Sequence, residues 1–348
     1  MRLIALATRS SGRPRTTSLA FMDDFSLPTR TLGPDGPPIG AIGLGCMGMS
    51  WAYNPEDRDD ERSISVIRHA LDIGVTLIDT ADAYGPYTNE QLVGRALEGR
   101  RADMVLATKC GLEVRSVEPM EISRNGRPEH VRAAIDASLE RLGTDHVDLY
   151  QLHRTDPEVP VEETWGAMAE VVAAGKARAI GMSEANVEEL EAAQAVHPVA
   201  SLQSEFSLWE RGPVDNGMLA WCRDHGAAFI PFAPLGRGFL TGQVTRETIT
   251  DGDMRGSNPR FTEEAMEQNL AILDRVRAVA ERYDAMPGQV ALAWLLAQYD
   301  RVVPIPGTRR VERLTENAGA ARLELSAEDL AELDALPAPA PAGERYSV

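Results

Sequence analysis

Four residues that could take part in a proton transfer lie at or just after the ends of short apolar segments. Asp79 ends the segment Thr-Leu-Ile-Asp, and Tyr84 follows five residues later. Lys109 ends Val-Leu-Ala-Thr-Lys, and His153 ends Leu-Tyr-Gln-Leu-His. A free tyrosine, with a pKa of about 10, is a weak acid at neutral pH, but a nearby ammonium lowers that pKa. The residue types therefore predict Tyr84 as proton donor to a carbonyl oxygen and Lys109 as the neighbour that lowers its pKa. Asp79 would keep Lys109 charged, and His153 would be a second polar contact for the oxygen.

Each of these residues also has a structural explanation when it is considered alone. Asp79 could cap a helix, Tyr84 could be a half-buried surface ring, and His153 could be a hydrogen-bonded core histidine. Lys109 is harder to explain in this way, because an ammonium at the end of a buried strand must find a counter-ion or water. Four such residues at matching strand ends favour a catalytic role over four separate structural ones.

The segments that must position these residues are continuous apolar runs that alternate with amphipathic helical patterns. Such runs are typical of parallel strands buried on both faces. Eight strands are predicted, at residues 42–46, 76–79, 104–109, 147–153, 179–183, 201–204, 228–234 and 302–306. The clearest helices are predicted at residues 63–71, 129–142, 161–174, 187–196 and 261–283. Eight strand-and-helix units predict a single (β/α)8 TIM barrel of the α/β class, with its active site at the carboxyl ends of the strands. A doubly wound sheet is the alternative, and the absence of a Gly-x-Gly-x-x-Gly turn weakens it.

Composition and charge exclude several classes of function. The chain has 348 residues, of which 43% are hydrophobic, and its net charge of −18 disfavours nucleic acid and anionic lipid as partners. No apolar run approaches the roughly 20 residues of a membrane span. Three cysteines without a C-x-x-C pair predict free thiols in a cytoplasmic protein. The histidines are scattered and form no H-E-x-x-H motif, so no metal is expected.

The barrel is expected to occupy residues 26–336. Residues 1–25 carry four arginines and an apolar run too short for a secretory signal, so they are predicted to be a disordered extension. Residues 337–348, rich in Pro and Ala, are predicted to be a tail. The connection 237–261 is unusually long, which is typical of a flap over a ligand, with Arg255 and Arg260 as further candidate contacts.

Ordered motifs along most of the chain resemble the aldo-keto reductase superfamily, especially its bacterial members. They are Gly-Leu-Gly-Cys-Met-Gly-Met-Ser at 43–50, the segment 79–85, Thr-Lys at 108–109, Gln-Leu-His-Arg at 151–154, Gly-Met-Ser-Glu at 181–184, and the segments 203–209, 231–242, 304–308 and 316–317. The resemblance implies reduction of an aldehyde or ketone with NADP(H). It also places Asp79, Tyr84, Lys109 and His153 at the positions of the family's catalytic tetrad.

The same resemblance implies three groups of cofactor contacts. The nicotinamide group is Ser183, Gln203 and Phe206, with Phe206 where the family usually has tyrosine. The pyrophosphate group is Pro234, Leu235, Gly236, Arg237 and Gly238, in a loop whose glycines let backbone N–H groups approach an anion. The phosphate group is Gly307, Thr308, Arg309, Arg313, Glu316 and Asn317. Guanidinium groups suit a phosphate monoester, which favours NADP over NAD. The alternative is a solvated helix start whose arginines pair with Glu312 and Glu316.

Two other functions remain open from the sequence. A non-catalytic subunit that senses nicotinamide nucleotides could share the fold and the motifs. The second alternative is a metal-dependent barrel hydrolase, which is disfavoured because the sequence has no cluster of metal ligands. The expected partner is a small-molecule carbonyl compound, and a homo-oligomer is compatible with the sequence.

Overall fold

Seven parallel strands form one curved sheet in the computed structural model, which describes residues 27–117 and 120–337. Their order in the sheet follows the chain from one edge to the other. The strands are β3 (Leu44–Gly45), β4 (Leu77–Asp79), β5 (Val105–Cys110), β8 (Val147–Leu152), β9 (Ala177–Ser183), β10 (Ser201–Glu205) and β11 (Ala228–Phe232). The predicted extension at 1–25 and all but the first residue of the predicted tail lie outside the described residues.

The segment 302–306 closes the sheet into a barrel between β11 and β3. The N–H of Ile305 donates to the Pro231 carbonyl at 3.0 Å, and the Pro304 carbonyl accepts from the N–H of Gly43 at 2.9 Å. Pro304 and Pro306 have no N–H to donate, which interrupts the regular ladder that a full strand would form. The predicted (β/α)8 barrel is confirmed, with its eighth strand reduced to this bonded segment.

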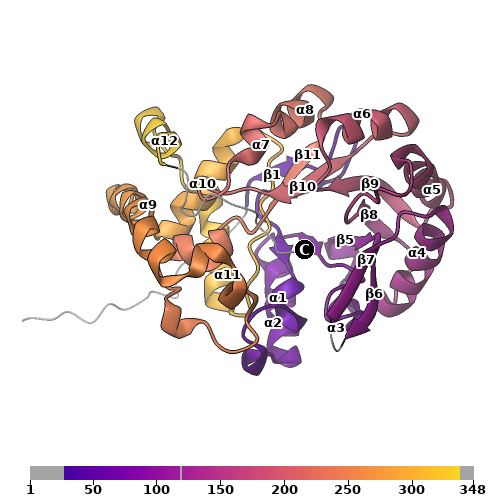
Figure 1. The fold of residues 1–348 in the computed structure, drawn as a ribbon, viewed down its shortest axis with the longest axis horizontal. Helices are drawn as coiled ribbons and strands as arrows, with labels where there is room; N and C mark the ends of the chain where they lie inside the picture. The colour runs from indigo at the N-terminus through magenta and orange to yellow at the C-terminus, as the bar shows by residue number, and fades with distance from the viewer. Residues whose placement is uncertain (1–26, 118–119, 338–348) are drawn as a thin grey trace, which may run out of the picture.

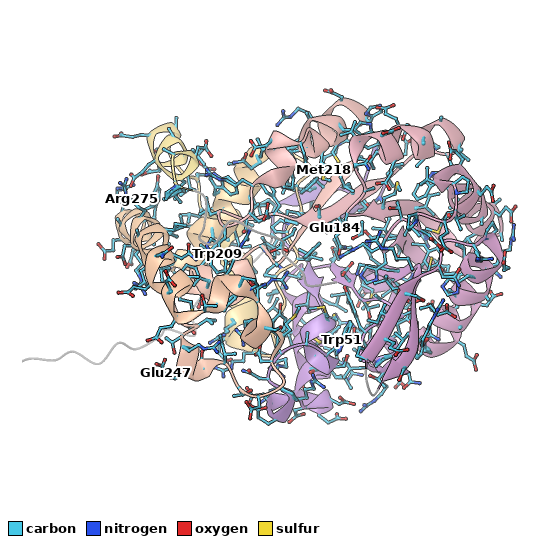
Figure 2. The ribbon with its side chains drawn as sticks, in the orientation of Figure 1. Trp51, Glu184, Trp209, Met218, Glu247 and Arg275 are labelled. Carbon is cyan, nitrogen blue, oxygen red and sulfur yellow. The ribbon has the colours of Figure 1, made fainter. Side chains whose placement is uncertain are left out.

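Helices surround the strands, as Figures 1 and 2 show. Their apolar faces pack on the sheet in one buried cluster. The longer helices are α2 (Asp60–Asp72), α3 (Thr88–Leu97), α4 (Pro128–Leu142), α5 (Val161–Ala173), α6 (Val187–Val196), α8 (Met218–His225), α9 (Glu263–Arg282), α10 (Pro287–Gln298), α11 (Val311–Gly319) and α12 (Ala327–Asp334). Two single turns are α1 (Met47–Ser50) and α7 (Gly212–Asp215). In α4 the predicted stripe of Val131, Ile135, Leu139 and Leu142 is buried, and Gly143 ends the helix with a φ of 65°. In the part of the chain that is described, no helix is long and apolar enough to span a membrane.

Two hairpins that the sequence did not predict cover opposite ends of the barrel. The first, β1 (Thr29–Thr31) and β2 (Pro38–Gly40), precedes the barrel strands. Leu32 and Ile39 belong to one buried cluster with residues at the amino ends of the strands. The second, β6 (Leu112–Val117) and β7 (Met120–Arg124), directly follows β5 at its carboxyl end. The amino end of the barrel is therefore plugged, while the carboxyl end carries a wall that can border a site.

Candidate active site

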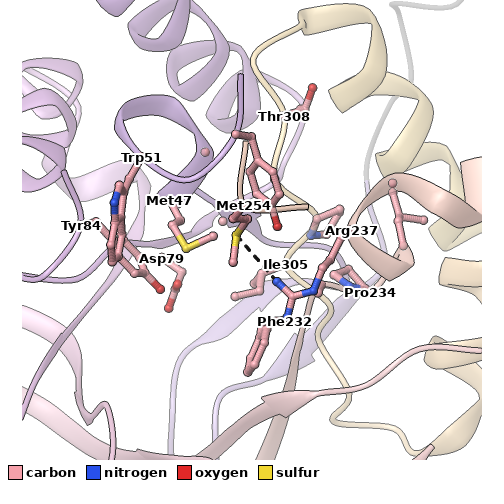
Figure 3. Close-up of a pocket in the computed structure, with 18 of the residues that line it drawn as sticks. Met47, Trp51, Asp79, Tyr84, Phe232, Pro234, Arg237, Met254, Ile305 and Thr308 are labelled. Atoms are coloured by element: carbon pink, nitrogen blue, oxygen red, sulfur yellow. Dashed lines mark hydrogen bonds between the residues drawn. The ribbon is translucent and has the colours of Figure 1, made fainter. Parts of the chain in front are cut away.

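A cavity of about 1280 Å³ lies at the carboxyl ends of the strands. Figure 3 shows Trp51, Tyr84 and Asp79 grouped on one side, with Arg237 and Pro234 on the other. The hairpin β6–β7, the α1 turn and the loop after β11 all contribute to its wall. One elongated cavity thus joins the predicted catalytic residues to the predicted cofactor loops.

Three of the predicted catalytic residues form one buried, hydrogen-bonded chain. The ammonium of Lys109, at 0% exposure, donates to Asp79 Oδ1 at 2.6 Å and to the Thr80 carbonyl at 2.7 Å. Its third contact is the Tyr84 hydroxyl at 3.3 Å. The chain runs from the end of β4 through the end of β5 to the cavity, because the parallel strands bring Asp79 and Lys109 to the same edge of the sheet.

Burial changes the expected acidity of the phenol. Burial raises the pKa of Tyr84 above its ordinary value, and the opposing effect of Lys109 is smaller. Lys109 thus lowers the pKa of Tyr84 as predicted, but burial outweighs its effect and the net shift is upward. Burial alone would lower the pKa of Lys109, but Asp79 and Tyr84 outweigh it and the pKa is raised. Tyr84 is consequently a protonated phenol beside a charged ammonium at neutral pH.

His153 completes the group from the end of β8. Its ring meets the Tyr84 ring edge-on, with 5.7 Å between centroids. Burial, then the charges of Arg154 and Lys109, hold the pKa of His153 well below its ordinary range. Its Nδ1 is buried and has no hydrogen-bond partner among the described residues. A neutral imidazole therefore faces the same part of the cavity as the Tyr84 phenol.

Two glutamines support Asp79 from β8 and β10, strands that are not adjacent to β4 in the sheet. Gln151 and Gln203 donate to Asp79 Oδ2 at 3.2 Å and 2.8 Å, so both carboxylate oxygens are bonded. The sequence prediction placed Gln203 only against the nicotinamide and missed Gln151. The available signal was a polar residue inside the otherwise apolar run that ends in His153.

Asn89 in α3 is a further buried support that the sequence prediction missed. Its amide nitrogen donates to the Cys46 carbonyl at 2.9 Å and to Ser50 Oγ at 2.7 Å, and its oxygen accepts from Thr80 Oγ1 at 2.6 Å. Asn89 thereby ties the α1 turn to Thr80, whose carbonyl holds Lys109. A polar residue in a helix is usually exposed, so the sequence carries no signal for this role.

Comparison with known proteins identifies the family. The sequence matches the family model "Aldo/keto reductase family" over residues 41–338. The chain belongs to the aldo/keto reductase family. It is 40% identical over 317 residues to the probable aldo-keto reductase 1 of Glycine max, covering 90% of each chain. It is 42% identical over 307 residues to the aldo-keto reductase yakc of Schizosaccharomyces pombe, whose name specifies NADP(+), covering 87% of this chain and 89% of that one.

Solved structures of aldo/keto reductases share the barrel. The glycerol dehydrogenase of Gluconobacter oxydans aligns with a TM-score of 0.80 at 30% identity, covering 88% of this chain and 94% of that chain. An aldo/keto reductase of Klebsiella pneumoniae, in complex with NADP and acetate, aligns with a TM-score of 0.68 at 27% identity, covering 91% of this chain and 98% of that chain.

Twelve of the fourteen cofactor contacts expected for an aldo/keto reductase line the cavity. They are Ser183, Gln203, Pro234, Leu235, Arg237, Gly238, Gly307, Thr308, Arg309, Arg313, Glu316 and Asn317. Gly236 is not among the lining residues, and a Cβ there would lie 2.7 Å from the Trp209 ring. This glycine therefore lets the loop pass over Trp209.

Phe206 does not face the cavity, which corrects the predicted aromatic contact. Its ring is 0% exposed and packs against Phe229 and Trp294, with centroids 5.7 Å and 5.3 Å away. The ring lies in the layer between the sheet and α10, on the opposite face of β10 from Gln203. Phe232, at the end of β11, lines the cavity instead.

The predicted phosphate site is basic and lacks the acidic partners of the alternative explanation. Arg309 donates to the Asn54 carbonyl at 3.2 Å, and Arg313 donates to Gln243. Within residues 27–117 and 120–337, neither guanidinium has a carboxylate within 4 Å, so neither pairs with Glu312 or Glu316. Arg237, in contrast, pairs with Glu205 at 2.9 Å with both side chains buried, which reduces its charge toward an anion.

The predicted flap is a series of 3-10 turns: η4 (Gly236–Thr241), η5 (Arg246–Thr248), η6 (Met254–Ser257) and η7 (Pro259–Phe261). The N–H of Met254 donates to the Ala52 carbonyl at 2.9 Å, which joins η6 to the loop after α1. Arg255 lines the cavity, as predicted for a contact. Arg260 does not line it and pairs with Glu210 at 2.9 Å, so its candidate role as a cofactor contact is wrong.

Proposed function

We propose that this chain reduces an aldehyde or ketone to the alcohol with NADPH, and that Tyr84 protonates the carbonyl oxygen. The observation that carries the proposal is the buried chain of Asp79, Lys109 and Tyr84, whose phenol reaches the cavity beside a neutral His153. A structural role alone does not require an ammonium, a phenol and an imidazole around one point in a cavity.

The residues present fit a nicotinamide dinucleotide phosphate. Phe232, Ser183 and Gln203 lie near the tetrad end, and Arg309 and Arg313 lie at the basic end of the same cavity. Guanidinium groups without carboxylate partners suit a phosphate monoester. The proposal is further supported by the relative named for NADP(+) and by the Klebsiella pneumoniae reductases in complex with NADP or NADPH. A nicotinamide bound here would supply the hydride.

The chain's own residues would manage the proton. Tyr84 stays protonated at neutral pH because burial raises its pKa. As charge develops on the substrate oxygen, the phenol proton passes to it, and Lys109 stabilises the phenolate that remains. Asp79 and the Thr80 carbonyl fix the ammonium in place. His153, being neutral, offers the oxygen a second hydrogen bond without competing as an acid.

Replacing Tyr84 with phenylalanine tests this function, because it removes the transferable proton and keeps the ring. Turnover of 4-nitrobenzaldehyde with NADPH should fall by about 10² or more, while NADPH binding, measured by fluorescence, should persist. Turnover near that of the wild type would remove Tyr84 from the mechanism. A wild-type chain that binds NADPH and reduces no aldehyde, ketone or sugar would instead favour a nucleotide-sensing subunit.

We also propose a cytoplasmic location and a small-molecule carbonyl substrate. Cys46, Cys110 and Cys222 are buried and unpaired, which suits a reducing compartment.

A further inference from the structure

Arg154 is a half-buried cation at the tetrad end of the cavity. It follows His153 directly after β8 and lines the cavity together with Tyr84. Its Nη1 donates to the His153 carbonyl at 2.6 Å and to Ser183 Oγ at 3.1 Å. Both acceptors are uncharged, so these bonds orient the guanidinium across the ends of β8 and β9 without neutralising it.

No carboxylate lies within 4 Å of the Arg154 guanidinium in the described part of the chain. Arg237 and Arg255, which also line the cavity, are both paired, with Glu205 and Asp253 respectively. Acidic residues outnumber basic ones by 53 to 35 in this chain. A shortage of carboxylates therefore does not explain why Arg154 lacks one as a partner. Holding a second cation near Lys109 is unfavourable unless an anion joins it.

The charge of Arg154 acts on the place where the substrate carbonyl would lie. Together with Lys109, it lowers the pKa of His153, and it also opposes the rise in the pKa of Tyr84. Two cations therefore influence the two groups that would contact the carbonyl oxygen. Lys109 is bonded to Asp79 and is at 0% exposure, which leaves Arg154 as the one of the two able to bind a second group of the substrate.

Part of the cavity wall is apolar near Tyr84. The Trp51 ring lies 6.0 Å from the Tyr84 ring, centroid to centroid. Further apolar residues that line the cavity are Met47, Leu112, Met120 and Ile122. A ligand that reaches Tyr84 thus meets both apolar side chains and the guanidinium of Arg154.

We infer that Arg154 binds a carboxylate of the substrate, so that the preferred substrates are carbonyl compounds with a carboxylate a few bonds from the carbonyl and an apolar remainder. A 2-oxo acid with an aromatic side chain fits this description. Its carbonyl would be reduced to a hydroxyl, with hydride from NADPH, which becomes NADP+, and a proton from Tyr84. The inference rests on the proposed function. The Nε and Nη2 donors of Arg154 are available for charge-assisted hydrogen bonds to a carboxylate.

The test compares each anion with its neutral ester. The pairs are phenylglyoxylate with methyl phenylglyoxylate, and 4-carboxybenzaldehyde with methyl 4-formylbenzoate. Dividing kcat/KM for the anion by kcat/KM for the ester, and comparing that ratio between variants, cancels the intrinsic reactivity of each compound. In Arg154→Gln the ratio should fall by about ten- to a hundredfold, mainly through KM for the anion. In Arg154→Lys the ratio should lie between those of the wild type and Arg154→Gln, because the positive charge remains but the planar guanidinium is lost.

Arg124→Gln is the matched control, since Arg124 lines the cavity from the exposed side of β7. It removes the same charge from the rim, where solvent screens it. The ratio should change less than about twofold in this variant. NADPH dissociation constants, measured on every variant, separate an effect on the substrate from one transmitted through Ser183.

Three results would overturn the inference. The first is an equal loss for anion and ester in Arg154→Gln, which would assign Arg154 to the acidity of Tyr84. The second is a change of the ratio in Arg124→Gln as large as that in Arg154→Gln, which would assign the preference for the anion to long-range charge. The third is a ratio that does not change in any variant. Failure of the wild type to reduce the neutral esters and 4-nitrobenzaldehyde would contradict the proposed function itself, so the two failures are distinguishable.

Discussion

Replacing Lys109 with methionine should remove a large part of the folding stability as well as the activity. The buried ammonium makes three contacts, with the Asp79 carboxylate, the Thr80 carbonyl and the Tyr84 hydroxyl. Methionine has a similar length but cannot donate to any of them. Removing one partner of a buried ion pair costs roughly 3 to 5 kcal/mol, out of about 5 to 15 kcal/mol for a whole protein.

A double-mutant cycle with Asp79→Asn isolates the charge from the packing. Asp79→Asn leaves the ammonium buried among neutral acceptors, so we expect a comparable loss. The double variant buries neither charge. Its loss in free energy of unfolding should therefore be about 2 to 3 kcal/mol smaller than the sum of the losses in the two single variants.

Urea unfolding at pH 7, followed by tryptophan fluorescence, gives the four free energies of unfolding. Turnover of 4-nitrobenzaldehyde should be severely reduced in all three variants, because each disturbs the stabilisation of the Tyr84 phenolate. Losses that add to within about 0.5 kcal/mol would refute the reasoning, since Asp79 and Lys109 would then not depend on each other for burial.

Three further outcomes are expected. Arg309→Ala combined with Arg313→Ala should raise the dissociation constant for NADPH about a hundredfold more than that for NADH, and added salt should shrink the difference; equal weakening would contradict a phosphate contact. Because burial raises the pKa of Tyr84, kcat for reduction should stay flat through neutral and mildly alkaline pH and fall only above the ordinary pKa of tyrosine, about 10, as the phenol loses its proton; a limb near neutral pH would point to another acid. Phe232→Ala should weaken NADPH binding with little effect on stability, whereas Phe206→Ala should destabilise the fold by roughly 3 to 5 kcal/mol; the opposite pattern in binding and urea titrations would restore Phe206 to the cofactor site.

The barrel could be predicted from the sequence because parallel strands buried on both faces are continuous apolar runs. The same property placed Asp79, Lys109 and His153, each of which interrupts such a run at its carboxyl end. The hairpin β6–β7 was missed because its alternation, with Leu112 and Val114 in one strand and Met120 and Ile122 in the other, is too short to distinguish from a loop.

Side-chain alternation along the strands predicts Phe232, and not Phe206, as the aromatic residue that faces the cavity. Gln203 faces Asp79 inside the barrel, so Phe206, an odd number of positions later, falls on the outer face. Ala228 and Ile230 belong to the inner cluster, and Phe232 continues their face to the cavity. Alternation also places Gln151 on the inner face, two positions after Leu149 of the same cluster. It could not have revealed Asn89, because the importance of Asn89 depends on which atoms it meets across other elements.

The seam between residues 302–306 and Gly43 has a consequence for how the barrel forms. Its two sides come from opposite ends of the barrel sequence, which makes their pairing one of the more non-local contacts among the described residues and a late one to form. Figure 1 shows the same arrangement on the outside, where the indigo α2 lies against α11. The cavity wall draws Gly45 and Met47 from one side and Gly307 and Thr308 from the other. A dinucleotide held between them would bind only the closed barrel, so its binding free energy would be added to that of folding.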